Sequence, residues 1–291
     1  MFVKIRYKQR IRSVAGNDEF CFHDLANDEF FGDFVVNYFF CLHLQNQMQY
    51  QNNEIMLDKL NLETVLFLDI ETVPAYAEYG QLPENFKKLW DHKITRLTKE
   101  NENDTPETLY HRAGIYAEFG KIICISVGFL AKRQFRIKSF YGDDEKVLLK
   151  KFSDLVNKHY NTPKHLLCAH NGKEFDFPYI SRRLLINGMP LPAILDLQGR
   201  KPWEVNHLDT MDLWRFGDYK NYTSLSLLTA IFDIPSPKDD IDGSMVATVY
   251  WHEKDLERIV KYCQKDTLAV AQILLRYMGR PLIKEEDIIF T

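Results

Sequence analysis

Two carboxylates in one apolar segment are the first sign of chemistry in this sequence. Asp69 and Glu71 stand two residues apart in the run VLFLDIET at residues 65–72, and Pro74 follows it. The run is short and rich in β-branched and aromatic residues, which is typical of a buried strand. Side chains alternate along a strand, so both carboxylates would point the same way from its tip. Poorly solvated carboxylates repel each other, and a cation relieves this; oxygen-only ligands favour Mg²⁺ or Mn²⁺.

A catalytic site built on two divalent cations needs carboxylates from several elements. In two-metal chemistry the ions lie about 4 Å apart, so further ligands must come from other segments. Asp176 follows a polar loop at residues 170–175 and precedes an expected helix. Helix N-capping is the commoner role of Asp at such a position, and it is compatible with metal binding because both place the carboxylate at an exposed end.

A further carboxylate, Asp266, lies in a long helix expected over residues 253–278. Tyr262 precedes it by four residues, so the phenol and the carboxylate emerge side by side on one helical face. Apolar neighbours such as Ile259, Val260 and Ile273 indicate that this part of the helix is packed. An unpaired carboxylate would be costly there, and a metal ion would compensate for it.

The segments that must position these residues alternate between strands and helices. We expect strands at about 64–70, 122–129, 134–140, 165–169 and 205–208. The expected helices lie at about 145–159, 177–186, 210–216, 223–231, 243–250 and 253–278. An insertion spans about 75–118, with helical stretches at 84–90 and 107–116. This order predicts an α/β fold with a mixed sheet of about five strands flanked by helices.

The composition limits the kind of function. The chain has 291 residues, is 45% hydrophobic and carries a formal net charge of -4. Without a global basic signature, any contact with nucleic acid should be local. The five cysteines are scattered with no C-x-x-C pair. This spacing favours the reduced thiols of a cytoplasmic protein over a disulfide framework or a zinc site. No apolar run is long enough to span a bilayer.

The first 55 residues differ from the rest of the chain. A basic start is followed by an acidic, Phe-rich stretch and a Gln/Asn tract, with no helical or strand period. We predict that residues 1–55 are an N-terminal extension, and that residues 56–291 form the functional domain. The extension packs on that domain, forms a flexible arm, or precedes a true start at Met56.

The ordered set of motifs resembles a known group of enzymes. D-x-E at Asp69 and Glu71, N-x-x-x-F-D ending at Asp176, and Y-x-x-x-D at Tyr262 and Asp266 are together similar to the DEDDy branch of the DnaQ-like 3′–5′ exonucleases. The most similar group is the free-standing family related to the proofreading domain of family-B DNA polymerases. The resemblance covers roughly residues 63–280. It implies a ribonuclease H-like fold and hydrolysis of nucleotides from a 3′ end, here without a polymerase part.

The resemblance also implies a role for each motif residue. Asp69, Glu71 and Asp266 would hold the Mg²⁺ or Mn²⁺ ion that activates water, and Asp69 would bridge to a second ion on which Asp176 acts. Tyr262 would orient the attacking water. A phenol, with a usual pKa of about 10, is unsuited to be the base near neutral pH.

Residues beside the motifs are candidates for substrate binding, each with an ordinary structural alternative. Thr72 would hydrogen-bond the terminal nucleotide, or is a simple strand-exit residue. Asn171 would touch sugar or phosphate, or ties down its own loop. Phe175 and Phe177 could stack on a base, although one of them is expected to face the core.

Hydroxyl groups precede the helix expected at 223–231. Tyr222 and Ser224, with Lys220 and Thr223 beside them, would bind phosphate at the helix N-terminus or serve as caps.

Other polar residues near the motifs have ordinary explanations. His207, Asp209 and Asp212 lie near the expected fifth strand and could serve as extra ligands, but we expect Asp209 to cap the following helix and to lie outside the metal shell. Arg182 and Arg183 are expected to be solvated.

The leading hypothesis is a two-metal 3′–5′ exonuclease that acts on single-stranded DNA and releases nucleoside 5′-monophosphates. One alternative is an exoribonuclease that processes RNA 3′ ends, because 2′-hydroxyl recognition lies outside the five motif residues. Another is a non-catalytic nucleic-acid-binding module on the same fold. A protein that has lost catalysis would be expected to lack one of the motif carboxylates, and all of them are present here. The 75–118 insertion would be a lid over the site or a partner surface.

Overall fold

The computed structural model describes residues 57–96, 104–218, 220, 222–235 and 241–291. The predicted extension at 1–55 lies outside this part of the chain, so the proposed division into an extension and a domain stays a prediction.

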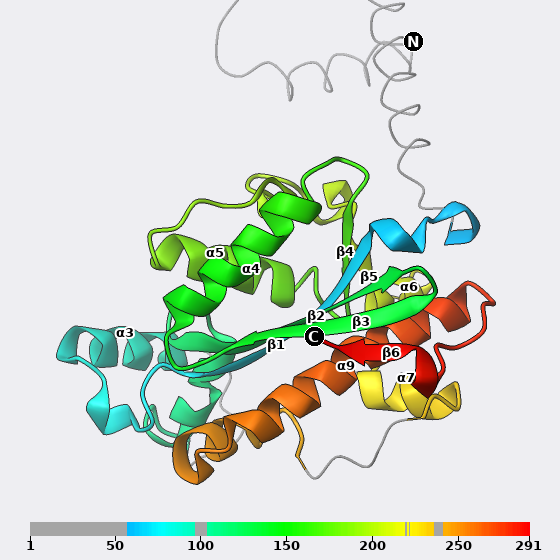
Figure 1. The fold of residues 1–291 in the computed structure, drawn as a ribbon. Helices are drawn as coiled ribbons and strands as arrows, with labels where there is room; N and C mark the ends of the chain where they lie inside the picture. Colours follow the sequence, from blue (N-terminus) through cyan, green and yellow to red (C-terminus); the bar gives the residue numbers. More distant parts are fainter. Residues whose placement is uncertain (1–56, 97–103, 219, 221, 236–240) are drawn as a thin grey trace, which may run out of the picture. The chain divides into compact units, whose positions relative to one another are not determined.

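A mixed sheet of six strands forms the centre of the described part of the chain (Figure 1). Its spatial order is β5-β4-β1-β2-β3-β6. The strands are β1 (Val65–Pro74), β2 (Gly120–Ala131), β3 (Gln134–Tyr141), β4 (Leu166–Ala169), β5 (Leu208–Asp209) and β6 (Ile288–Phe290). β1 pairs antiparallel with β2 and parallel with β4. The predicted α/β architecture, a helix-flanked mixed sheet of the kind expected for a ribonuclease H-like fold, is confirmed.

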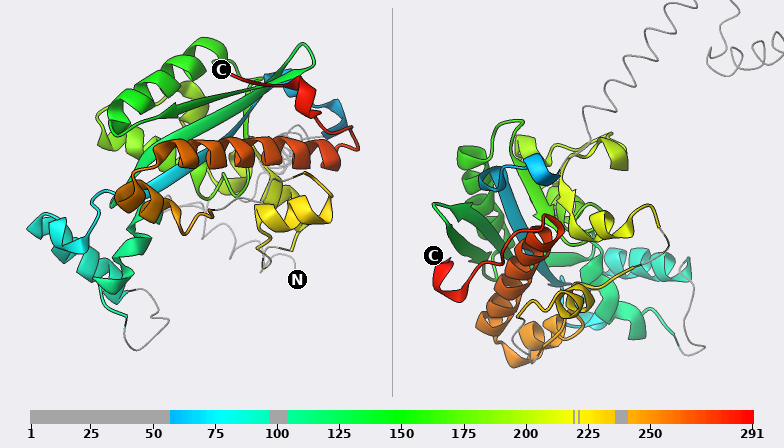
Figure 2. Two further views of the ribbon diagram at one scale, coloured as in Figure 1. Left: turned by 60° about the horizontal axis from the view of Figure 1, so that its bottom comes forward. Right: turned by 90° about the vertical axis from the view of Figure 1, so that its right-hand side faces the viewer.

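Helices cover both faces of this sheet (Figure 2). α4 (Glu145–His159) and α5 (Asp176–Ile186) lie on one face, and α9 (Leu256–Tyr277) lies on the other. Leu66, Leu68 and Ile70 of β1 share a buried core with the inner sides of α4 and α5. Alternate residues of β1 therefore face α9 instead. The shorter helices are α3 (Glu84–Thr95), α6 (Thr210–Arg215), α7 (Leu225–Ile231) and α8 (Val246–Thr248), the last followed by a π-helix, η7 (Val249–Glu253).

Three strands differ from the predicted ones. β1 continues past Glu71 to Pro74, because Thr72 and Val73 still pair with β2 after a bulge. The acidic pair thus lies inside the strand rather than at its tip. β5 is only two residues long, and β6 was not predicted, because its three residues are held only by pairing with β3.

The 75–118 insertion builds a small core of its own. It contains α3 and a 3₁₀-helix, η4 (Thr108–Ile115), close to the predicted helical stretches. Trp90 is fully buried among aromatic rings. Its ring centroid lies 5.7 Å from that of Tyr110 and 5.2 Å from that of Phe119. The Tyr179 hydroxyl donates to the Gly114 carbonyl at 2.7 Å and so ties the insertion to α5.

One prediction about charged residues is wrong. Arg183 was expected to be solvated, but its side chain is only 11% exposed and pairs with Glu145 at 2.5 Å. Its Nη1 also donates to the Ala117 carbonyl at 2.7 Å. The helical period correctly predicted α5, but it did not show that α4 lies against this side of the helix.

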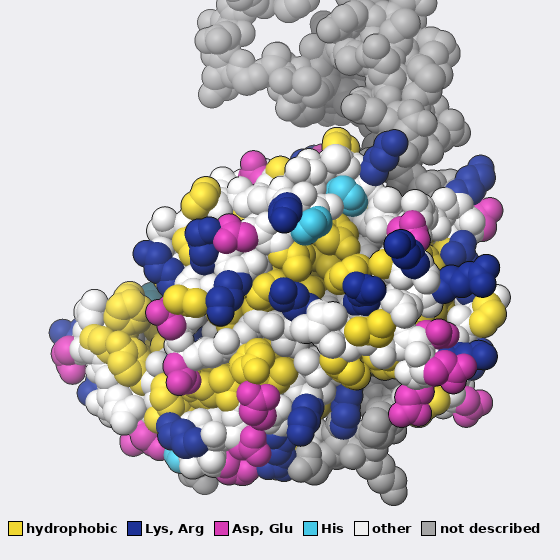
Figure 3. Space-filling view, viewed as in Figure 1, with side chains coloured by type: hydrophobic (Ala, Val, Ile, Leu, Met, Phe, Trp, Pro, Cys, Tyr) yellow, Lys and Arg dark blue, Asp and Glu magenta, His cyan; other side chains and the backbone are white. Residues whose placement is uncertain are grey.

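The surface charges and the cysteines can be compared with what the composition predicts. Lys and Arg side chains are interspersed with Asp and Glu on the face in Figure 3, so this face carries no broad basic area. Cys124, Cys168 and Cys263 are buried free thiols, and the cytoplasmic location stays a prediction. Among the described residues, every helix is too short or too polar to cross a membrane.

Candidate active site

The acidic pair lies on the face of β1 that looks toward α9. Asp69 pairs with Ser126 and Glu71 with Cys124 across the antiparallel β1–β2 ladder. From α9, the Cys263 thiol donates to the Asp69 carbonyl oxygen at 3.4 Å. Asp69 is partly buried and Glu71 is buried. The strand period therefore holds two carboxylates under the long helix, as the spacing predicted.

An early end of β4 brings the third carboxylate to this place. The β1–β4 pairing stops at Phe67 and Cys168, so β4 does not pair with β1 beyond that point. The chain turns through residues 170–175 into α5, and the carboxylate of Asp176 accepts a hydrogen bond from the Ile70 backbone. The expected N-cap role is wrong: Phe175 is the N-cap, and Asp176 is the first helical residue and only 4% exposed.

Helix α9 supplies the fourth carboxylate and the phenol. The charge of Asp266 raises the pKa of both Asp69 and Glu71, which shows that it acts on the same cluster. Tyr262 shares a hydrogen bond with Asp266. Burial first, and then the charge of Asp266, raise the pKa of the Tyr262 phenol above its usual range. All five predicted motif residues thus come together from β1, α5 and α9.

Burial and mutual repulsion disfavour the ionised form of these carboxylates when no cation is bound. Burial is the main cause that raises the pKa of Asp69 and Glu71 well above their usual values, and the neighbouring carboxylates add to it. Burial also raises the pKa of Asp176 to about 8. Asp69 Oδ2 is buried without a hydrogen-bond partner in the described part of the chain. Clustered carboxylates with an unsatisfied oxygen fit a divalent cation, which compensates desolvated negative charge.

Cys263 is a member of the cluster that the sequence did not reveal. Its sulfur and one carboxylate oxygen each from Asp69 and Glu71 lie within 4.8 Å of one another. Cys263 follows Tyr262 and precedes Asp266 by three residues, so helical spacing could have placed it beside the site.

Comparison with known proteins identifies the family. A family described as "Predicted 3'-5' exonuclease related to the exonuclease domain of PolB" matches residues 115–282, more than half of the chain. The chain belongs to this family. The matched segment includes Asp176, Tyr262 and Asp266, whereas Asp69 and Glu71 lie before it. Their place in the site therefore rests on the strand geometry and the electrostatics described above.

Individual relatives are distant and much longer. The DNA polymerase of Pyrococcus glycovorans is 22% identical over 211 residues, 60% of this chain and 26% of the relative. The DNA polymerase of Thermococcus sp. (strain GE8) is 28% identical over 181 residues, 55% of this chain and 10% of the relative. The solved family B DNA polymerase from the hyperthermophilic archaeon Pyrobaculum calidifontis has a TM-score of 0.40 and 17% identity, and the match covers 73% of this chain and 24% of that chain.

In this member of the family, the loop after β4 is tied down on both sides. The His170 ring bridges the Thr210 hydroxyl and the Thr223 carbonyl, each at 2.9 Å. Asn171 has a left-handed backbone with φ of 62°, and its N–H donates to Asp209 Oδ1 at 2.9 Å. Its backbone therefore fixes the loop, while its side-chain Oδ1 is buried without a partner among the described residues.

The neighbouring polar residues are structural. Asp209 is the N-cap of α6, as predicted, and accepts from the backbone of Met211 and Asp212. Both ring nitrogens of His207 are occupied, by the Leu167 N–H and the Ile194 carbonyl. Burial lowers the pKa of His207 to about 4, so the ring is neutral near pH 7. These contacts leave His207 no free nitrogen for a metal.

The substrate-binding candidates differ from one another in burial and in their contacts. Phe177 is fully buried, which confirms that one of the two phenylalanines faces the core, and Phe175 is half-buried beside Tyr179. Thr72 is half-buried and hydrogen-bonds the Tyr179 hydroxyl.

The two candidates before α7 also differ from each other. Tyr222 is 70% exposed. Ser224 Oγ accepts from the Leu227 N–H at 3.2 Å and is the N-cap of α7. Its capping role is therefore real, while the exposed phenol remains available for a ligand.

Proposed function

We propose that this chain is a metal-dependent 3′–5′ exonuclease that hydrolyses the last phosphodiester bond of single-stranded DNA and releases nucleoside 5′-monophosphates. The observation that carries the proposal is the convergence of Asp69, Glu71, Asp176 and Asp266 with Tyr262 in a chain of this exonuclease family. The chain spans 26% and 10% of the two polymerase relatives, so their names support the substrate class only as a proposal.

The four carboxylates are the groups that would hold the ions, here proposed as two Mg²⁺ or Mn²⁺. Asp69, Glu71 and Asp266 would hold one, and Asp69 with Asp176 the other. When bound, the ions would lower the pKa of water and offset the charge of the phosphate. The buried Asp69 Oδ2, which has no partner among the described residues, supports this assignment.

The proposed substrate contacts follow from the groups that surround the acids. Asn171 Oδ1 is buried, has no partner in the described residues, and can accept a hydrogen bond from the terminal sugar. Thr72 and the half-buried ring of Phe175 would border the last nucleotide, and the exposed ring of Tyr222 would stack on a base. Ser224 would act through the α7 N-terminus rather than through its occupied hydroxyl.

The first test is digestion of matched oligonucleotides. A 5′-labelled single strand of DNA should yield a ladder that shortens from the 3′ end with Mg²⁺ or Mn²⁺, and EDTA should stop it. We expect the RNA strand of the same sequence to be digested more slowly. Faster digestion of RNA would make the chain an exoribonuclease, and no digestion of either strand with either metal would leave a binding module.

Tyr262 gives a second, more specific prediction. The raised pKa keeps its hydroxyl protonated, so it would hydrogen-bond and orient the water and would not remove a proton. Replacing Tyr262 with Phe should lower kcat by about tenfold to a hundredfold through poorer positioning. Calorimetric titration with Mn²⁺ should give the wild-type affinity. A variant that loses Mn²⁺ binding would contradict the positioning role.

A further inference from the structure

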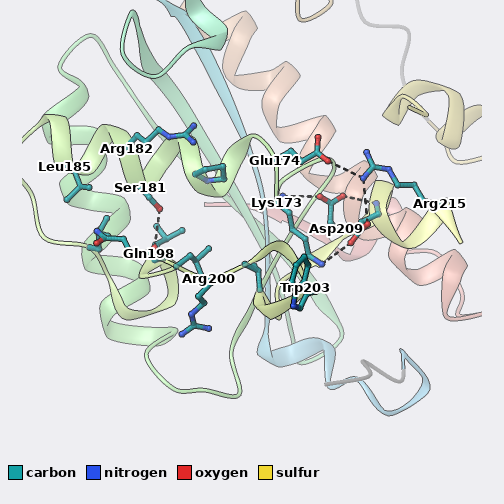
Figure 4. Close-up of a pocket in the computed structure, with 16 residues that line it drawn as sticks. Lys173, Glu174, Ser181, Arg182, Leu185, Gln198, Arg200, Trp203, Asp209 and Arg215 are labelled. Atoms are coloured by element: carbon teal, nitrogen blue, oxygen red, sulfur yellow. Dashed lines mark hydrogen bonds and ion pairs between the residues drawn. The ribbon is translucent and has the colours of Figure 1, made fainter. Parts of the chain in front are cut away.

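A groove of about 870 Å³ runs along the outer side of α5 (Figure 4). Ser181, Arg182 and Leu185 of the helix line one side, while its opposite side faces the core. The segment from 191 to 205 forms the other wall. Its floor is apolar, with leucines and a valine from both walls: Leu185, Leu191, Leu195, Leu197 and Val205. None of the four carboxylates of the acidic cluster lines this groove, so the groove is a separate surface.

The acidic side chains of this groove are paired, whereas two of its arginines have no carboxylate partner among the described residues. Each acidic residue that lines it is already occupied. Asp212 pairs with Lys173 at 3.0 Å, Glu174 pairs with Arg215 at 3.3 Å, and Asp209 is bound by backbone N–H groups. Arg182 and Arg200 are exposed, and the described part of the chain gives neither a carboxylate partner. Figure 4 shows these two arginines on opposite walls of the groove, Arg182 on α5 and Arg200 on the facing segment.

An aromatic platform lies in the same groove. Trp203 is 60% exposed, which is unusual for the largest apolar side chain. The ammonium group of Lys201 lies 5.3 Å from its ring. An exposed indole between cations is the arrangement that binds single-stranded nucleic acid, because bases stack on the ring and phosphates contact the cations.

The groove begins at the loop that delivers Asp176 to the acidic cluster. Lys173 and Glu174 belong to this loop and line the groove. Asp209 also lines it, and the Lys173 N–H donates to Asp209 Oδ2 at 3.0 Å. This loop therefore connects the two sites in the chain, since Lys173 and Glu174 line the groove and Asp176, two residues later, belongs to the acidic cluster.

We propose that this groove binds the upstream part of a single-stranded substrate, with phosphates on Arg182 and Arg200 and a base stacked on Trp203. The proposal rests on the proposed exonuclease function. An apolar floor could also take a peptide, but the free cations and the continuity with the acidic cluster favour nucleic acid.

Binding to strands of two lengths tests the proposal directly. The background is full-length protein carrying Asp69→Asn, with EDTA present, so that no strand is cut. The groove variant adds Arg182→Glu and Arg200→Glu. The matched control adds Lys146→Glu and Lys158→Glu, two exposed cations of α4. In fluorescence anisotropy, the groove variant should bind a strand of about sixteen nucleotides at least tenfold more weakly, and a strand of about four nucleotides with less than twofold change.

Kinetics with the active protein provide a second arm. Trp203→Ala should raise KM for the long strand about tenfold and leave kcat and the KM of the short strand unchanged; Trp203→Phe should recover most of the loss. If wild-type protein digests no strand, the exonuclease proposal fails, while the anisotropy arm still decides the groove. The groove proposal would be overturned if the groove variant and the control bound the long strand equally well. It would also be overturned if the groove variant lost the same affinity for the short strand as for the long one. Binding of an acidic peptide in place of the long strand would also overturn it.

Discussion

Replacing Asp69 with asparagine is expected to abolish exonuclease activity while making the metal-free protein more stable. Activity should fall by at least about 10³-fold, because Asp69 would contact both ions and its loss would weaken stabilisation of the developing charge. Stability should rise because burial and three neighbouring carboxylates disfavour the Asp69 charge. A residue with only a structural role would show the opposite change in stability.

The stability gain has a defined pH dependence. The pKa of Asp69 and of Glu71 is raised in the folded state, and that of Asp176 lies at about 8. From about pH 4, the usual pKa of a carboxyl group, up to about pH 8 the folded metal-free protein therefore holds more protons than the unfolded chain, so its free energy of unfolding falls as pH rises. The Asp69→Asn substitution removes one of these titrating charges. The advantage of the variant over wild type should be smallest near pH 4 and should grow as the pH rises toward 8.

Thermal unfolding in EDTA at several pH values, repeated with Mg²⁺, measures both effects. Mg²⁺ should raise the Tm of wild type at pH 8 and have little effect on the variant. The matched control is Asp154→Asn on α4, a carboxylate whose side chain is 61% exposed, and it should leave activity unchanged and lower Tm only slightly. An Asp69→Asn variant that is less stable than wild type at pH 8 would refute the electrostatic account.

The largest stability loss is expected from Glu145→Ala. The Glu145 carboxylate accepts from the Ile122 N–H at 2.7 Å, from Arg183 Nε at 2.8 Å and from Asn187 Nδ2 at 2.9 Å. It thereby joins β2, α4 and α5 at a side chain that is only 8% exposed. Its removal would leave Arg183 as a buried cation without its counter-ion, which costs about 3–5 kcal/mol.

Urea unfolding compares this pair with an exposed one. Lys150 and Asp154 form an i,i+4 pair on α4 with side chains 64% and 61% exposed. Asp154→Ala should lower the free energy of unfolding by about 0.5 kcal/mol or less. The folded Glu145→Ala protein should keep its exonuclease activity at low temperature, since Glu145 lies outside the acidic cluster. Equal effects from the two substitutions would contradict the role given to the buried network.

Local signals explain which parts of the fold could be predicted. Helix α4 has the predicted bounds, 145–159, because Asp144 accepts from the Val147 N–H as its N-cap and the apolar period runs through to the end. Asp176 shows the limit of such signals. Its position resembled an N-cap, yet its carboxylate instead meets the Ile70 backbone of a strand far earlier in the chain. Arg183 and β6 were misjudged or missed for the same reason, since their partners are distant in sequence.

The sequence by itself determined the chemistry of the candidate site: two carboxylates on one strand face, and a phenol and a carboxylate on one helix face. These relations follow from the periods of a strand and a helix, so they need no knowledge of the rest of the fold. Only the tertiary structure decided that β1, α5 and α9 meet, how deeply their charges are buried, and that Cys263 lies among them. The groove beside Trp203 and Arg200 likewise arises from packing between segments that no local pattern connects.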